Sequence, residues 1–89
     1  MKAVITVVGK DTMGIIAKVS TACAEHGVNI IDISQSVLKE YFAMIMLADI
    51  DRCAIPFSEF VDKMRMLGEE NALEIRAMHE DIFNSMHKI

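Results

Sequence analysis

The first third of the chain changes its hydrophobic period twice. Residues 2–8, KAVITVV, are apolar on both faces and rich in β-branched side chains, which predicts a strand inside a sheet. Ile16, Val19 and Cys23 then recur at helical spacing, with Ile15 and Ala22 widening the stripe. We expect Asp11 or Thr12 to cap this helix and Gly27 to end it as a C′ glycine.

The remainder of the chain predicts three strands and two helices. Ile31, Ile33 and Val37 alternate with polar residues and predict a half-exposed strand, and the apolar segment 41–50 predicts an internal one. A helix follows Pro56 and ends near Gly68, and residues 72–78 alternate again as an edge strand. The helix buries a stripe made of Phe57, Phe60, Val61, Met64 and Leu67. Leu73, Ile75 and Ala77 face inward from the edge strand, and Ile82, Met86 and Ile89 predict a short docked helix in the tail.

The predicted order is therefore β-α-β-β-α-β followed by a helix. This order is typical of the ferredoxin-like α+β fold, an antiparallel sheet with its helices on one face. At 89 residues the chain has room for one core, so we expect a single domain over 1–89 with a helical tail over 79–89.

The composition favours self-association. Hydrophobic residues make up 53% of the chain and the mean hydropathy is +0.33. A domain this small buries only about 60% of its unfolded surface, so a monomer would leave much of this apolar material in water. A homodimer would hide more of it.

Charge and cysteine content exclude several partners. The net charge is −4 and the basic residues are scattered, which argues against nucleic acid. The apolar stretch over residues 43–48 is too short for a membrane span, and the first residues run into a strand without a cleavage site. Cys23 and Cys53 lack metal spacing and are typical of reduced thiols. We expect a cytoplasmic protein.

The glycine-bounded loop VVGKDTMGIIAKV invites a phosphate-binding interpretation that its own residues do not support. A P-loop needs Lys and then Ser or Thr directly after its second glycine, but Gly14 is followed by Ile15 and Ile16. Gly9 and Gly14 also do not make the dinucleotide fingerprint. The loop is a glycine-bounded turn at the start of a helix.

Other chemistries of this fold class lack their residues as well. The loop has neither the arginine of an acylphosphatase nor the CxxC of a metallochaperone, and the first strand lacks the aromatic residues of an RNA-recognition motif. His79 opens HEDIF without the second histidine of a zinc motif, and His87 lies about two turns further on. No nucleophile and base stand at recognisable spacing. We expect no enzyme activity, metal or cofactor.

The segment DTMGIIAKVSTACAEHGVNIIDISQ is similar to the opening of ACT domains, where D-x-x-G-I starts a helix and G-x-N-I starts the second strand. The tail HEDIFNSMHKI resembles the ending of small stand-alone ACT proteins of uncharacterised function. The resemblance implies an allosteric regulatory module that binds small molecules, usually amino acids, between two copies of itself. By position it implies ligand contacts at Asp11, Thr12, Met13, Gly14, Ile15, Asn29 and Ile30.

Topology gives a reason for two chains. In the split order, the loop after the first strand and the start of the second strand lie at opposite ends of the sheet. Antiparallel pairing of the second strands of two chains would bring Asn29 of one toward the loop of the other, giving two shared sites per dimer. Structural roles stay open: Gly14 for close helix packing, Asp11 as an N-cap and Asn29 as a turn residue.

The sequence therefore predicts a homodimeric module that binds an amino acid or related metabolite and passes the signal to a separate enzyme or regulator. The alternative is an interaction module that docks on a metabolic enzyme or regulator without a ligand, using Ile82, Phe83 and Met86 of the tail.

Overall fold

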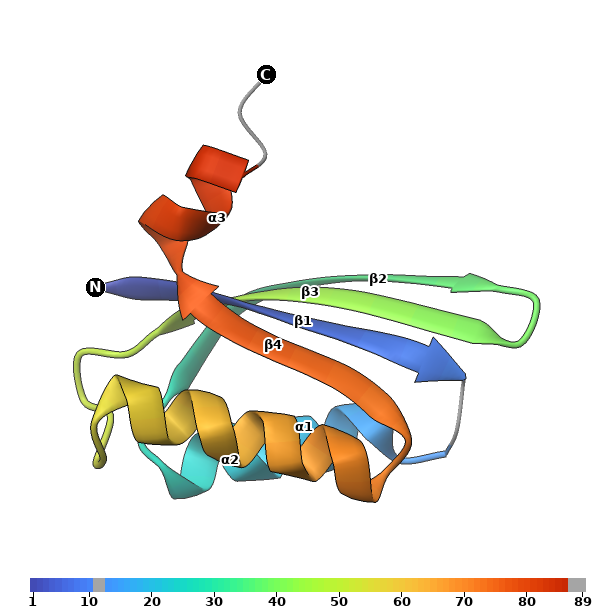
Figure 1. Ribbon diagram of the computed structural model, residues 1–89, viewed down its shortest axis with the longest axis horizontal. Helices are drawn as coiled ribbons and strands as arrows, with labels where there is room; N and C mark the ends of the chain where they lie inside the picture. Colours follow the sequence, from blue (N-terminus) through green and yellow to red (C-terminus); the bar gives the residue numbers. More distant parts are fainter. Residues whose placement is uncertain (11–12, 87–89) are drawn as a thin grey trace.

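A computed structural model describes residues 1–10 and 13–86 of the 89-residue chain (Figure 1). Four strands and three helices follow one another in the order β-α-β-β-α-β-α. The elements are β1 (Lys2–Lys10), α1 (Ile15–Glu25), β2 (Asn29–Leu38), β3 (Tyr41–Asp49), α2 (Phe57–Glu70), β4 (Leu73–His79) and α3 (Glu80–Met86). The predicted ferredoxin-like α+β fold and its C-terminal helix are confirmed.

The strands form one antiparallel sheet in the order β2-β3-β1-β4 (Figure 1). β1 and β3 are internal, as their unbroken apolar runs predict, whereas β2 and β4 are the edges. Helices α1 and α2 cover one face of the sheet, and α3 stands on the opposite side. We call that opposite side the open face; it carries Val4, Thr6, Val8, Tyr41, Ile45, Glu74 and Arg76.

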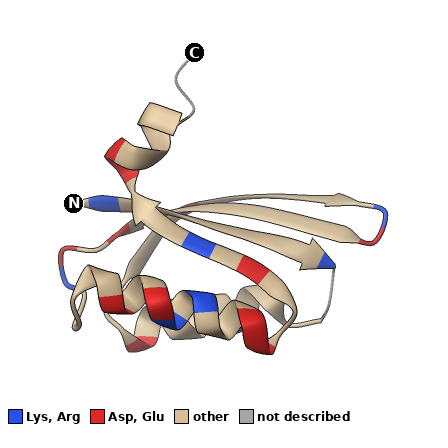
Figure 2. Ribbon diagram, in the orientation of Figure 1, with Lys and Arg blue, Asp and Glu red and all other residues tan. Residues whose placement is uncertain are grey.

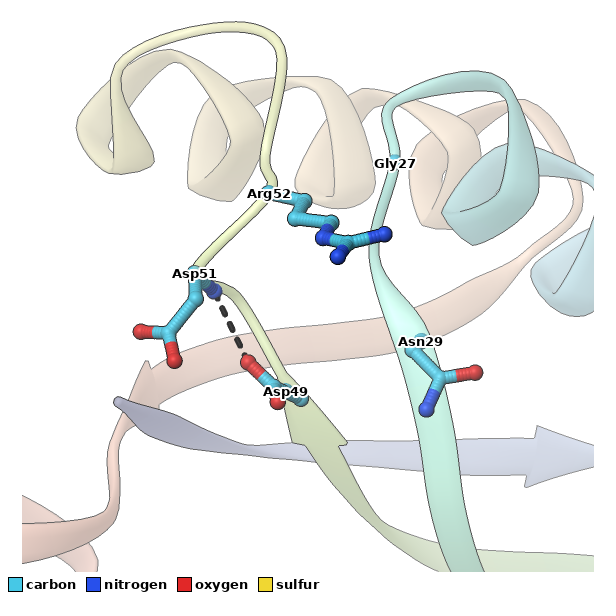
Figure 3. A pocket seen from close by; sticks show the side chains of 5 residues that line it. All are labelled: Gly27, Asn29, Asp49, Asp51 and Arg52. Carbon is cyan, nitrogen blue, oxygen red and sulfur yellow. Dashed lines mark hydrogen bonds between the residues drawn. The ribbon is translucent and has the colours of Figure 1, made fainter.

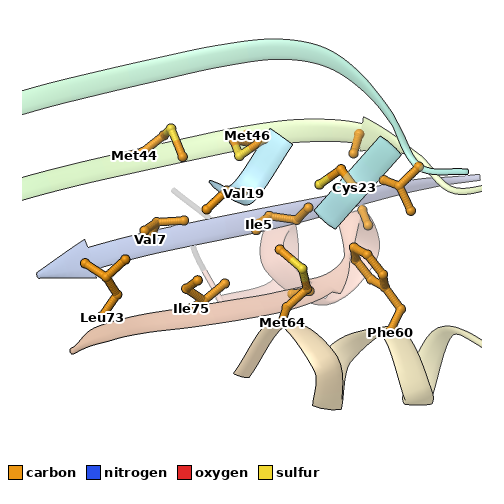
Figure 4. Packing of buried hydrophobic residues seen from close by; sticks show 14 of the residues in the cluster. Ile5, Val7, Val19, Cys23, Met44, Met46, Phe60, Met64, Leu73 and Ile75 are labelled. Atoms are coloured by element: carbon orange, nitrogen blue, oxygen red, sulfur yellow. The ribbon is translucent and has the colours of Figure 1, made fainter. Parts of the chain in front are cut away.

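The core lies between the sheet and the two long helices (Figure 4). β3 alternates strictly, with every second side chain from Phe42 to Ala48 buried against the helices. From α2, Phe60 and Met64 are fully buried, and Phe57, Val61 and Leu67 pack at the margin of the core. The predicted stripe of α2 is therefore confirmed, as are the inward residues Leu73, Ile75 and Ala77 of β4.

The start of α1 differs from the prediction. The N-cap is Gly14, and among the described residues no side chain makes a capping hydrogen bond there. The prediction of Asp11 or Thr12 as the N-cap is wrong, because Gly14 occupies that position. Asp11 and Thr12 themselves lie outside the described part of the chain. Because the helix begins at Ile15, the buried stripe runs through Ile15, Val19 and Cys23, and Ile16 is exposed.

The end of α2 also differs. The helix continues past Gly68 to Glu70, and Asn71 is its C-cap. Gly68 is buried against β4, where a Cβ atom would lie 2.6 Å from the carbonyl oxygen of Leu73. The left-handed residue after the cap is Ala72, with φ of 56°. Gly68 therefore permits close packing and does not end the helix.

The prediction that β2 buries one face is wrong. Ile31, Ile33 and Val37 are 47%, 38% and 56% exposed. Ile33 and Val37 lie opposite the buried residues Met46 and Phe42, so they are on the helix side of the sheet. They stay exposed because β2 is an edge strand that the helices do not cover.

The tail forms the predicted helix, α3, but is barely docked. α3 contacts β1 and β4, yet it buries no side chain completely. Phe83 is half-buried, whereas Ile82 and Met86 are exposed. The predicted contact at Ile89 lies outside the described residues.

Candidate functional site

One end of the sheet carries the loop that leads into α1. Gly14 adopts a left-handed backbone with φ of 83°, and a Cβ atom there would meet nothing within 4 Å. Close helix packing is therefore not the reason for Gly14; its backbone conformation is. Its carbonyl accepts a hydrogen bond from the Lys18 amide at 3.0 Å, which opens the helix.

The start of α1 lies at the surface of the protein. Met13 is almost fully exposed and Ile15 is buried, so the loop passes from solvent into the core within three residues. The first amides of a helix have no intrahelical acceptor, and the helix dipole favours an anion beside them. This end of the sheet is suited to a carboxylate. The predicted contacts Asp11 and Thr12 lie outside the described residues.

The opposite end is built by the turn from α1 into β2. Gly27 is in the left-handed region with φ of 74°, as predicted for a C′ residue. The Gly27 amide donates to the Ala24 carbonyl at 3.2 Å, and the Val28 amide to that of Cys23 at 2.9 Å. These two bonds form a Schellman motif, which fixes the direction in which β2 departs.

A loop after β3 closes against this turn. The Ala54 amide donates to the His26 carbonyl at 2.8 Å, and the Gly27 Cα lies so close to the Arg52 carbonyl that a Cβ would collide with it. Between turn and loop lies a cavity of about 490 Å³ lined by Gly27, Asn29, Asp49, Asp51 and Arg52 (Figure 3).

Charges of both signs surround this cavity. The Arg52 side chain extends from the loop toward the Gly27 turn (Figure 3). Asp49 accepts a hydrogen bond from the Asp51 amide at 2.9 Å, and Asp51 pairs with the Met1 ammonium group. The hydrogen bond to Asp51 raises the pKa of this ammonium group. A ligand at Asn29 would therefore meet an amide, a guanidinium and carboxylates.

Sequence reasoning found Asn29 but missed Asp49, Asp51 and Arg52. Asp49 joins the cavity because it is the cross-strand partner of Asn29, and the other two follow it in the loop. The signal available in the sequence was the run Asp49–Arg52 directly after an internal strand.

The two halves of the predicted site lie far apart within one chain. Asn29 pairs with Asp49, and Asp49 pairs with Lys2, at the start of β1; the loop begins after Lys10, at its end. Eight residue steps at about 3.4 Å separate these ends by roughly 27 Å. Met13, Gly14 and Ile15 form one group, and Asn29 and the half-buried Ile30 the other.

The thiol of Cys23 and the imidazole rings of His26 and His79 pack against other side chains of the fold. Cys23 is buried in the core, and burial raises the pKa of its thiol to about 11, so it stays protonated near neutral pH. His79 packs on Phe57 with ring centroids 4.5 Å apart, and His26 meets Phe60 edge-on at 6.0 Å. Within residues 1–10 and 13–86, no three His, Cys, Asp or Glu side chains are grouped to hold a metal ion, and no helix is long and apolar enough to span a membrane.

Comparison with known proteins agrees with the observed fold and identifies the protein family. The model of the ACT domain family matches residues 2–78. The chain belongs to the ACT domain family. It is 49% identical over 89 residues to a UPF0237 protein of Clostridium perfringens, with 100% of both chains covered. This ACT domain is therefore a regulatory ligand-binding module.

Solved structures resemble it along nearly the whole chain. An ACT domain protein from Streptococcus pneumoniae is 42% identical, with a TM-score of 0.82 and 98% of each chain covered. The ligand-free regulatory subunit of aspartate kinase from Thermus thermophilus is 27% identical, with a TM-score of 0.67, over 86% of this chain and 50% of that one.

Proposed function

We propose that this ACT domain is a cytoplasmic homodimer that binds an amino acid or related small metabolite at two sites shared between the chains. The observation that carries this proposal is the separation of Gly14 from Asn29 by the length of the sheet. One chain presents two half-sites, so a complete site needs a second chain.

The edge strand β2 offers the contact. Pairing two copies of β2 antiparallel places Asn29 of one chain beside Leu38 of the other, at the end of the sheet from which the partner's loop departs. The exposed Ile33 and Val37 would be covered by the same contact, which also removes an unpaired strand edge. A closed two-fold arrangement repeats the site on the other side.

The chemistry of the half-sites supports an amino acid. Helix-start amides beside Gly14 suit a carboxylate, while Asn29 and Asp49 suit an ammonium or hydroxyl group. We propose that a separate enzyme or regulator reads the ligand-bound state. A ligand shifts that state only by its differential affinity, typically about 1–3 kcal/mol.

A thermal-unfolding screen against the twenty amino acids and related metabolites tests ligand binding. A ligand at about one hundred times its dissociation constant should add about 2.7 kcal/mol of stability, which moves the midpoint by several degrees. Asn29→Ala should abolish the shift. Asn84→Ala, an exposed asparagine on α3, is the matched control and should keep it.

Mixing two inactive variants tests whether the site is shared. Gly14→Asp places a carboxylate where the ligand's own would lie, in a backbone conformation that Asp tolerates and in open space. Random re-pairing of Gly14→Asp with Asn29→Ala chains should restore about a quarter of the sites, because half the dimers then carry one intact site. No recovery on mixing would place the ligand within one chain, and a flat screen with wild-type protein would refute ligand binding.

A further inference from the structure

Arg52 differs from the other arginines of the chain in its lack of an ionic partner. The sequence contains three arginines, at positions 52, 65 and 76. Arg65 pairs with two carboxylates of α2, and Arg76 pairs with a glutamate of β4, where blue and red segments lie close together in Figure 2. Within the part of the chain that the structure describes, the Arg52 guanidinium makes neither an ion pair nor a hydrogen bond. Its five N–H donors are therefore available to an anion.

Two carboxylates line the same cavity as Arg52, yet neither pairs with it. Asp51 is its neighbour in the chain but pairs with the Met1 ammonium group. Asp49 is half-buried and accepts the hydrogen bond of the Asp51 amide at 2.9 Å. Figure 3 shows the Arg52 side chain extending away from Asp51, toward the Gly27 turn. The cavity therefore presents a positive and a negative side chain that do not neutralise each other.

The backbone that carries Arg52 is held in place by hydrogen bonds. The Cys53 amide donates to the Ile50 carbonyl at 3.1 Å, which makes a β-turn with Arg52 at its third position. Directly after this turn, the Ala54 amide donates to the His26 carbonyl at 2.8 Å. Arg52 is therefore presented by a fixed turn, and binding of a ligand has to order only its side chain.

We propose that Arg52 binds the side-chain carboxylate of the ligand, so that the site takes a dicarboxylic amino acid. This inference rests on the proposed function, which assigns the ligand's first carboxylate to the start of α1 in one chain and its ammonium group to Asn29 and Asp49 of the other. Arg52 lines the same cavity as these two residues and supplies a second group for an anion. An amino acid with a neutral side chain would leave this guanidinium without a partner.

The charges of the cavity match the groups of such a ligand. The Met1 ammonium group balances Asp51, which leaves Asp49 and Arg52 as the two opposite charges that a ligand meets. Asp49 suits the ligand's ammonium group, and Arg52 suits a carboxylate that accepts two parallel hydrogen bonds. A basic side chain would meet Arg52 as a like charge, and an apolar one would displace water from both charged groups without replacing its hydrogen bonds.

Calorimetric titration with aspartate, glutamate, asparagine and glutamine tests the class of ligand. We expect one of the two acids to bind at least about tenfold more tightly than its own amide, because only the acid offers Arg52 a second carboxylate. Amides that bind as tightly as the acids would overturn this inference, and so would binding of apolar amino acids alone; both results leave the proposed function standing. If no amino acid or related metabolite binds, the proposed function fails and this inference fails with it.

Variants of Arg52 assign this preference to its side chain. Arg52→Gln should weaken binding of the preferred acid by at least about tenfold and leave binding of its amide unchanged. Arg52→Lys keeps the charge but not the planar fork, so it should weaken the acid less. Arg65→Gln is the matched control, because Arg65 pairs along α2 and does not line the cavity.

The unfolding midpoint without ligand checks the fold of these variants. It should stay at the wild-type value in Arg52→Gln, because the Arg52 guanidinium makes no ion pair or hydrogen bond among the described residues. Equal weakening of the acid and the amide by Arg52→Gln would overturn the inference, since Arg52 would then not read the side chain of the ligand. Unchanged binding of the acid by Arg52→Gln would overturn it as well.

Discussion

At the scale of single residues, Gly14 and Gly27 share a left-handed backbone but have different surroundings. A side chain at Gly14 would point into open space, whereas one at Gly27 would collide with the Arg52 carbonyl. Gly14→Ala should therefore cost about 1–2 kcal/mol, the cost of the backbone conformation alone. Gly27→Ala should cost clearly more, because the loop at Arg52 must also move.

Urea unfolding of both variants at neutral pH measures this difference. The matched variant for close approach without backbone strain is Gly9→Ala, where φ is ordinary and the nearest atom is the Leu73 Cδ2 at 2.6 Å. Equal destabilisation by Gly14→Ala and Gly27→Ala would contradict the contact between Gly27 and the loop after β3.

The thiol of Cys23 makes the stability of the folded chain fall at alkaline pH. Its thiol has a pKa of about 11 in the folded chain and 9.0 as the reference, so between these values the folded chain holds a proton that the unfolded chain has lost. Stability is full below pH 9 and falls as the pH rises toward 11, by up to about 2–3 kcal/mol. Unfolding under reducing conditions at pH 8 and pH 10.5 should show a smaller loss for Cys23→Ala than for wild type. Equal losses would show that another group carries the dependence.

At the scale of elements, the spacing of hydrophobic residues predicted the features that depend only on neighbouring residues in the chain. The central strands and the buried stripe of α2 follow from hydrophobic spacing alone. The exposure of β2 could not be predicted from hydrophobic spacing. A half-buried strand and an uncovered edge strand show the same alternation, and only the order of strands in the sheet distinguishes them. Gly68 misled for a similar reason: a glycine near a helix end is typical of a C′ residue, but here it makes room for β4.

The register of β2 explains why Asp49, which lines the candidate cavity, escaped prediction. The hairpin pairs Leu38 with Tyr41, and the ladder is shifted by one residue at a bulge between Ile30 and Asp32. This extra residue puts Asn29 opposite Asp49; an unbroken ladder would have put Ile30 there. No sequence signal marks this bulge, so the pairing of Asn29 with Asp49 is seen only in the structure. Asn29 itself was found through the resemblance to ACT domains.

At the scale of the whole molecule, two exposed surfaces account for the high apolar content. The β2 edge, with Ile33 and Val37, and the open face, with Val8 and Ile45, leave different sides of the sheet uncovered. A monomer of 89 residues would keep both in water.

Ligand binding and assembly at β2 should be linked, because the proposed site exists only where two chains meet. Val37→Lys adds a charge to the β2 edge at an exposed position, so it should separate the chains there and abolish the ligand's thermal shift. In wild type, the ligand found by the screen should tighten the β2 contact by about 5–150-fold, the range of a coupling of about 1–3 kcal/mol. Sedimentation of dilute labelled protein with and without ligand measures this change, and Met66→Lys, which adds a charge at an exposed position of α2, should behave as wild type. Full ligand binding by Val37→Lys chains that no longer pair at β2 would place the site within a single chain, and the separation of Gly14 from Asn29 would then need another explanation.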